Sequence, residues 1–320
     1  MIRAALLGLG NVAWKYDANN SRSTFPLTQA GAMRAHPDVR LIGGCSPDHC
    51  DREGFHTWSE GLPVYADASA MLNELKPQMV GICSPTSAHY THAEMCLEAG
   101  VQLLWLEKPA TEHVAETQAL IALAKECEAT VCVNYFRRYL PIYQNFRKAL
   151  QDKIYGESRV LRIFYSPGLA RNGVHLLDIL FFITGAESYE LLWVEQPSNS
   201  NSPCFALRLS SGQSVQVSGA DLPYHTNDIT AVCEQGIFSV VRGGKEFIDE
   251  KVMENTLFPG FFELCPQKES VLGEADLNNY MTNALNDLVS CFATKQQPLS
   301  NLHSAQLTQR LLDDILVEKV

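Results

Sequence analysis

Positive charge is scarce in this sequence, in which 36 Asp and Glu outnumber 25 Lys and Arg and the formal net charge at pH 7 is -11. Nucleic acids and anionic membrane surfaces attract proteins through a positive field. We therefore expect neither nucleic-acid nor membrane partners. The charge instead favours a small-molecule ligand and other protein subunits.

Regular cysteine spacing and an apolar leader are also missing. The ten cysteines include no C-x-x-C pair. Cys83, in the apolar run that starts at Val80, is typical of a small buried thiol in a reducing compartment. Met1 is followed almost directly by a strand-like run rather than by a signal peptide or a membrane-spanning helix. These features predict a cytoplasmic protein.

The sequence does have enough apolar material for two cores. Its 320 residues are 46% hydrophobic and 19% charged, and single cores stop growing at roughly 250 to 300 residues. Residues 1–133 alternate strand-like and helix-like segments, the pattern of a parallel sheet covered by helices. The strand-like segments are 2–7, 39–45, 79–83, 101–106 and 130–133. Asp67 and Thr111 are expected to cap two of the helices, the second of which reaches Glu128.

Beyond Val133 the segments become longer and more β-like, with short turns such as 210–212 that permit antiparallel pairing. The expected strands are 159–165, 190–195, 205–209, 214–218 and 229–241. Two helices close the chain, one from Leu277 to Phe292 with Asp276 as its cap and one over 307–315. The expected fold class is α/β, with a doubly wound parallel sheet in residues 1–133. Residues 134–320 are expected to form an α+β domain with a mostly antiparallel open sheet, whose last helices can pack back on the first domain.

A glycine turn follows the first strand. Gly8-Leu9-Gly10-Asn11-Val12-Ala13 matches G-x-G-x-x-A, the dinucleotide fingerprint, in which Gly8 forms the tight turn and Gly10 lets the main chain approach a pyrophosphate. Gly8, Gly10, Asn11 and Val12 are therefore candidate cofactor-binding residues. The polar stretch 14–26 predicts a first helix that is either short or delayed to about 27–36.

The second strand ends at Ser46, where an NAD-specific site often has an acidic residue for the ribose hydroxyls. Ser46 with Arg52 nearby suits the 2'-phosphate of NADP. The charges of Asp48 and Asp51 oppose that phosphate. The sequence thus leaves both NAD and NADP open as the cofactor.

Two basic residues are candidate catalytic groups. Lys108 follows the strand 101–106 at the sheet edge over which ligands bind, where an ammonium can stabilise an alkoxide. His175 begins a helix and can serve as a general acid-base, with Asp178 placed to orient it. A surface lysine and a core histidine are the alternatives. No third ligand accompanies His89 and His92, so we expect no metal site.

Four motifs together resemble the glucose-fructose oxidoreductase and inositol dehydrogenase family, often written Gfo/Idh/MocA. They are Gly8-x-Gly10-x-x-Ala13, Ser84-Pro85-Thr86-Ser87-Ala88-His89, Glu107-Lys108-Pro109 and Gly173-x-His175-x-x-Asp178. The resemblance implies a Rossmann domain and NAD(P)-linked oxidation or reduction of a sugar or cyclitol. It also implies a second domain whose open sheet often forms a subunit interface, here in a homodimer or homotetramer.

By the same resemblance, Lys108 supports charge on the reacting oxygen and His175 moves its proton, so both must converge on one nicotinamide ring. Pro109 is expected to follow a cis peptide. The later motifs add candidate cofactor-binding residues: Ser84, Pro85, Thr86, His89, Glu107 and Lys108. The candidate substrate-binding residues are Lys108, Asn134, Arg138, Arg171, His175 and Asp178.

Arg171 departs from the family, which commonly has aspartate four residues before the histidine. An arginine fork pairs with carboxylate or phosphate, so an acidic sugar such as a uronate or a nucleotide-linked sugar is the favoured substrate. Two other functions stay open, a non-catalytic dinucleotide-binding sensor and a hydrolase or epimerase with tightly held NAD. Lys108 and His175 favour the dehydrogenase, because a sensor needs no proton shuttle.

Overall fold

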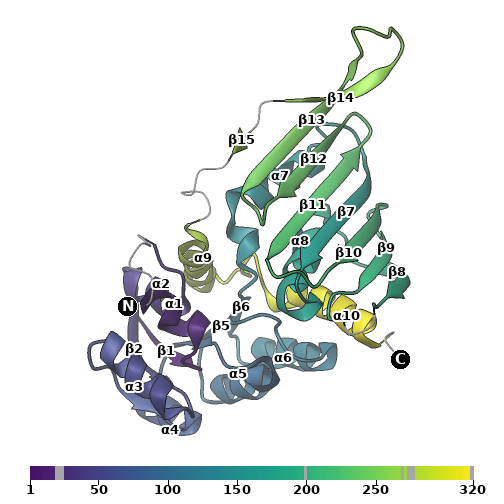
Figure 1. Cartoon of the computed structure of the whole chain (residues 1–320). Coiled ribbons are helices and arrows are strands. Elements are labelled where there is room, and N and C mark those ends of the chain that lie inside the picture. The colour runs from purple at the N-terminus through teal and green to yellow at the C-terminus, as the bar shows by residue number, and fades with distance from the viewer. Residues whose placement is uncertain (19–24, 198–199, 268–269, 272–277, 318–320) are drawn as a thin grey trace. The chain divides into compact units, whose positions relative to one another are not determined.

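The computed structural model describes residues 1–18, 25–197, 200–267, 270–271 and 278–317. The chain divides into two compact units. The first contains residues 1–136 and 278–309, and the second contains residues 137–277 and 310–320. Each unit has its own sheet, and both sheets can be followed in Figure 1.

Over its described residues, the first unit has a sheet of six strands, all paired in parallel, in the order β3-β2-β1-β4-β5-β6. They are β1 (Ile2–Leu7), β2 (Val39–Cys45), β3 (Val64–Tyr65), β4 (Met79–Ile82), β5 (Leu103–Leu106) and β6 (Thr130–Val133). Every residue of β4, β5 and β6 is buried, because helices cover both faces of the sheet. The strand order reverses between β1 and β4, and this switch point is where doubly wound sheets bind ligands.

Local capping groups fix the start of some helices of this unit. They are η1 (Asn11–Lys15), α1 (Tyr16–Ala18), α2 (Gln29–Ala35), α3 (His49–Trp58), α4 (Ala68–Leu75), η2 (Thr86–Ala88), α5 (His89–Glu98), α6 (Val114–Glu126) and α9 (Tyr280–Thr294), with η3 (Phe136–Tyr139) at the boundary. Asp67 caps α4 as expected, because its carboxylate accepts the Ala70 N–H at 2.8 Å. The expected cap Asp276 and the expected helix residue Leu277 lie outside the described residues.

The prediction that Thr111 caps α6 is wrong. The hydroxyl of Thr111 donates to the main-chain oxygen of His113 at 2.8 Å instead. Glu116 reaches back to accept the His113 N–H at 3.3 Å, so the helix begins after His113. The buried Thr111 hydroxyl also lies 2.6 Å from the hydroxyl of Thr117 within α6, but it does not accept an N–H from the first turn of that helix.

The first helix is both short and delayed. The π-helical turn η1 and α1 span only residues 11–18, and α2 starts at Gln29. Asp17 accepts the main-chain N–H of Leu27 at 2.7 Å and of Thr28 at 3.1 Å. The Thr28 hydroxyl in turn caps α2 by accepting the Gly31 N–H at 3.1 Å. These contacts tie Asp17, within the polar stretch 14–26, to the start of α2.

The second unit contains a nine-stranded sheet in the part of the chain that the structure describes, in the order β14-β13-β12-β11-β7-β10-β9-β8, with β15 paired to β13. The strands are β7 (Ser158–Ser166), β8 (Tyr189–Glu195), β9 (Cys204–Leu209), β10 (Ser214–Gly219), β11 (Thr226–Cys233), β12 (Gly236–Val241), β13 (Glu246–Glu254), β14 (Phe262–Pro266) and β15 (Ser270–Val271). Among the described strand pairs of this sheet, only β7 and β10 are parallel. The expected mostly antiparallel sheet is confirmed.

The prediction of one strand over 229–241 is wrong. A two-residue turn at 234–235 divides this stretch into β11 and β12, and Cys233 pairs with Gly236 across the turn. The turn contains Glu and Gln rather than the usual Gly or Asn, so the apolar alternation on either side concealed it. The charged strand β13, which pairs next to β12, was also not anticipated.

Helices α7 (Pro141–Gln151) and α8 (Val174–Thr184), the π-helical turn η4 (Leu169–Gly173) and the end of α10 (Leu302–Val317) complete this unit. Burial alternates along β10 and β11, as it does in a sheet with one covered and one open face. The β13–β14 hairpin extends beyond the neighbouring strands (Figure 1) and exposes Leu257, Phe258, Phe261 and Phe262. None of the described helices is long and apolar enough to span a membrane.

Candidate dinucleotide-binding and catalytic site

The glycine turn lies at the switch point of the first sheet. Gly8 has a φ of +87°, and a Cβ there would lie 2.5 Å from the main-chain nitrogen of Ser84, so no other residue fits. A Cβ on Gly10 would meet no atom within 4 Å. The main chain at Gly10 is therefore open to a ligand, with the exposed Asn11 and Val12 following it on η1. This arrangement fits the diphosphate of a dinucleotide.

The end of β2 lies beside the same turn. The hydroxyl of Ser46 is 3.5 Å from a carboxylate oxygen of Asp51, and the other oxygen of Asp51 forms an ion pair with Lys15. Arg52 donates from Nη1 to the main-chain oxygens of Ser46 at 2.7 Å and Pro47 at 2.9 Å. Sequence reasoning missed Lys15. Its signal was a basic residue two positions beyond the last small residue of the fingerprint, Ala13.

A buried carboxylate follows β5. One oxygen of Glu107 accepts hydrogen bonds from the side-chain amides of Gln29 at 2.9 Å and Asn134 at 2.7 Å. Asn134, expected to bind substrate, is thus hydrogen-bonded within the first unit. Gln29 was missed, although a glutamine on the otherwise apolar buried face of a helix is itself a signal. Burial raises the pKa of Cys83 well above its usual value, and the charge of Glu107 adds to the effect.

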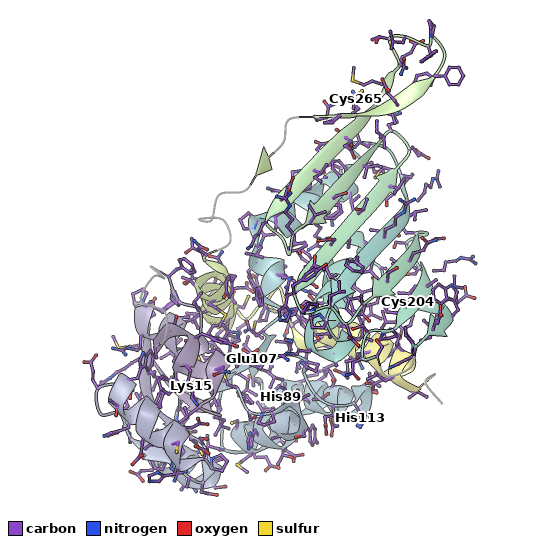
Figure 2. The ribbon with its side chains drawn as sticks, viewed as in Figure 1. Lys15, His89, Glu107, His113, Cys204 and Cys265 are labelled. Carbon is purple, nitrogen blue, oxygen red and sulfur yellow. The ribbon has the colours of Figure 1, made fainter. Side chains whose placement is uncertain are left out.

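His89 joins the loops that follow β4 and β5. Its Nε2 lies 2.9 Å from the main-chain oxygen of Ser84, and its Nδ1 lies 2.9 Å from that of Pro109. Figure 2 labels His89 and Glu107, both in the first unit. The Lys108–Pro109 peptide is cis, as expected, and Lys108 is half-buried. His89 therefore links the main chain of the loop after β4 to that of the loop after β5. Ser84, Pro85 and Thr86, in the first of these loops, remain at least partly exposed.

His92 lies one turn further along α5. Its Nδ1 is 2.9 Å from the hydroxyl of Ser84. Burial lowers the pKa of His92, and the neighbouring His89 lowers it further. His92 thus contacts the same loop as His89 but by a side chain rather than by the main chain.

Replacing His89 by phenylalanine is expected to weaken NADH binding about tenfold. The aromatic ring is close in shape but removes both ring nitrogens from the carbonyl oxygens of Ser84 and Pro109. A buried hydrogen-bonding group that loses its partner costs about 1–3 kcal/mol. ADP-ribose, which lacks the nicotinamide, should bind as before, because the glycine turn is untouched. Fluorescence titration with both ligands measures this. His92→Phe is the matched control, and equal losses for NADH and ADP-ribose in His89→Phe would contradict the role.

The second unit contains a buried ion pair beside His175. The Nε and Nη2 atoms of Arg138 each donate to one oxygen of Asp178 at 2.7 Å. The exposed fractions of the two side chains are 6% and 0%. The guanidinium of Arg138 also lies 5.3 Å from the centre of the Phe182 ring. Arg138 and Asp178, both expected to bind substrate, therefore form a buried ion pair with each other.

His175 is the second residue of α8 and only 6% exposed. Arg171 lies exposed on η4, and the next residue, Asn172, is buried and donates to the main-chain oxygen of Ser166. This anchors a π-helical turn, a conformation that often occurs at functional sites. Lys108 and His175 belong to different units, and their joint action on one ring stays a prediction. The described residues include no cluster that could hold a metal ion.

The strand order, the glycine turn at the switch point and the polar cluster after β5 define a dinucleotide-binding doubly wound domain. Residues 2–135 match the family described as "Oxidoreductase family, NAD-binding Rossmann fold". This region of the chain is therefore similar to the Gfo/Idh/MocA family, in agreement with the resemblance seen in the sequence. The family's description as NAD-binding agrees with the expected class of cofactor.

Two curated relatives are dehydrogenases of sugars by name. D-glucoside 3-dehydrogenase of Escherichia coli is 25% identical over 58% of this chain and 54% of its own length. UDP-N-acetylglucosamine 3-dehydrogenase of Acidithiobacillus ferrooxidans is 32% identical over 40% of this chain and 42% of its own length. The chain thus spans about half the length of these curated relatives.

A solved structure shows the same fold over nearly the whole chain. The WlbA dehydrogenase from Bordetella pertussis, in complex with NADH and UDP-GlcNAcA, superposes with a TM-score of 0.77 at 15% identity. The match covers 99% of this chain and 95% of that one. The expected pair of a Rossmann domain and an open-sheet domain is therefore confirmed.

Proposed function

We propose that this protein is an NAD(P)-dependent oxidoreductase that transfers hydride between the nicotinamide and a hydroxyl- or keto-bearing carbon of a sugar, sugar acid, nucleotide sugar or cyclitol. The observation that carries the proposal is the glycine turn at the switch point. There Gly8 has no space for a side chain, whereas the main chain at Gly10 is open. The match of residues 2–135 to an NAD-binding oxidoreductase family supports it.

The bound dinucleotide supplies the hydride chemistry, and the protein binds and orients the reactants. The turn from Gly8 to Val12 would hold the diphosphate, and the loop from Ser84 to Thr86 would line the nicotinamide. Lys108 would place its ammonium against charge developing on the reacting oxygen. His175 would accept or return the proton of that oxygen.

A turnover assay tests the proposal against the two other functions. The protein is incubated with NAD or NADP and a panel of sugars, sugar acids and nucleotide sugars, and both absorbance at the NAD(P)H band and products are followed. Reduced cofactor formed in step with product marks the dehydrogenase. Product without net change of cofactor marks a hydrolase or epimerase. Dinucleotide binding without any product marks a sensor.

For the substrate, we propose a carboxylate- or phosphate-bearing sugar. The support is the exposed Arg171 on its anchored turn, because a guanidinium pairs with both groups through two hydrogen bonds. Arg171→Ala should lower kcat/KM about tenfold or more for the best acidic substrate, while a neutral analogue of the same sugar changes little. An unchanged kcat/KM for the acidic substrate would discard this substrate class.

We also propose that the open sheet of the second unit forms a homodimer or homotetramer. The support is the large exposed apolar side chains at the β13–β14 hairpin, with Phe261 71% and Phe262 69% exposed. Contiguous exposed apolar groups on a folded protein commonly mark an interaction surface. Sedimentation velocity at micromolar protein concentration measures the size of the assembly.

A further inference from the structure

One carboxylate connects the two elements that surround the adenosine ribose in dinucleotide-binding domains. Asp51, on the first turn of α3, forms an ion pair with Lys15 on η1, directly after the glycine turn. Its other oxygen lies 3.5 Å from the hydroxyl of Ser46, the residue that follows β2. In this fold the ribose lies between the glycine turn and the end of the second strand.

The position of Asp51 is set by the helix that carries it. Its N–H donates to the carboxylate of Asp48 at 2.8 Å, which caps α3. The side chains of Lys15 and Asp51 are 33% and 22% exposed. The ion pair is therefore partly shielded from water yet accessible to a ligand.

The cations near Ser46 are already engaged by protein groups. Lys15 is paired with Asp51, and Arg52 donates to the main-chain oxygens of Ser46 and Pro47. A 2'-phosphate placed here would meet the carboxylate of Asp51 and would have to displace Lys15 from it. A 2'-hydroxyl could instead donate a hydrogen bond to that carboxylate.

We propose that Asp51 selects NAD over NADP, taking the role of the acidic residue that NAD-specific sites often carry where this chain has Ser46. The inference rests on the proposed function, since it assumes that a dinucleotide binds at the glycine turn. Asp51 accepts the ribose hydroxyls, and its pairing with Lys15 removes the charge that would attract a 2'-phosphate. Loss of the Asp51 charge frees Lys15 for that phosphate.

The test is direct binding of NADH and NADPH to the full chain, measured by fluorescence titration without turnover. The wild type should bind NADH at least about tenfold more tightly than NADPH. Asp51→Asn, which keeps the shape, should reduce this preference about tenfold or reverse it. Lys15→Met added to Asp51→Asn should remove the gained affinity for NADPH.

Glu53→Gln is the matched control. It removes the same charge from the same helix, but Glu53 is 70% exposed and faces His49 at 3.5 Å. Its ratio of affinities should equal that of the wild type. Equal or tighter NADPH binding by the wild type, or an unchanged ratio in Asp51→Asn, would overturn the inference and leave the proposed function standing. Failure of the wild type to bind either dinucleotide would overturn the proposed function and this inference with it.

Discussion

Replacing Arg138 by methionine is expected to lower the free energy of unfolding by about 3 to 5 kcal/mol. The variant leaves the carboxylate of Asp178 fully buried without its bidentate partner, which holds both of its oxygens at 2.7 Å. A buried charge of this kind cannot recover its hydration. Thermal unfolding of the full chain, followed by near-UV circular dichroism, should show a midpoint lowered by on the order of 10 °C.

Two variants make this result specific. Replacing Arg138 and Asp178 together by methionine and leucine should recover much of the stability, because no unpaired charge is left. Lys148→Met breaks the ion pair between Lys148 and Asp152, whose two side chains are 74% and 48% exposed. It should lower the free energy of unfolding by less than about 1 kcal/mol. If Arg138→Met destabilised no more than Lys148→Met, the ion pair would have no structural importance.

Replacing Lys108 by methionine should lower kcat by about 100- to 1000-fold on the best substrate found in the turnover assay. Methionine keeps the length of the side chain and removes the ammonium that we assign to the reacting oxygen. Dinucleotide affinity should change by less than about threefold, because an interaction made mainly in the transition state is lost. Steady-state kinetics and NADH titration measure the two quantities separately.

The matched control is Lys125→Met, on an exposed position of α6 in the same unit. It removes the same charge and should keep full activity. A kcat for Lys108→Met within about threefold of the wild type would remove Lys108 from the chemistry. A parallel loss of NADH affinity would show instead that Lys108 binds the cofactor.

Much of the first unit could be predicted because its signals are local. Met79–Ile82 and Leu103–Leu106 are continuous apolar runs, which is typical of strands covered on both faces. Gly8 stands where the backbone takes a positive φ, and Asp67 caps its helix through a neighbour three residues away. Such contacts span a few residues, so the pattern of residue types is sufficient to find them.

The second unit was less predictable because some of its strands form through contacts with neighbouring strands rather than through a local pattern of residues. The strand β13 contains Glu246, Asp249 and Glu250 among its apolar residues, and it forms because β12 offers a free edge. The turn before β12 lacks glycine and proline, so the alternating apolar residues of β11 and β12 predicted one continuous strand. Edge pairing depends on a neighbour that the local sequence does not reveal.

The sequence by itself determined the class of fold, the glycine turn and the positions of Lys108 and His175 at the start or end of their elements. Only the tertiary structure decided which polar groups meet. Glu107 accepts from Gln29, 78 residues away, and Arg138 pairs with Asp178 over 40 residues. His89 and Asp51 likewise find partners on other elements. A buried polar side chain needs a hydrogen-bonding partner. Strand order and packing decide which distant residue lies close enough to be that partner.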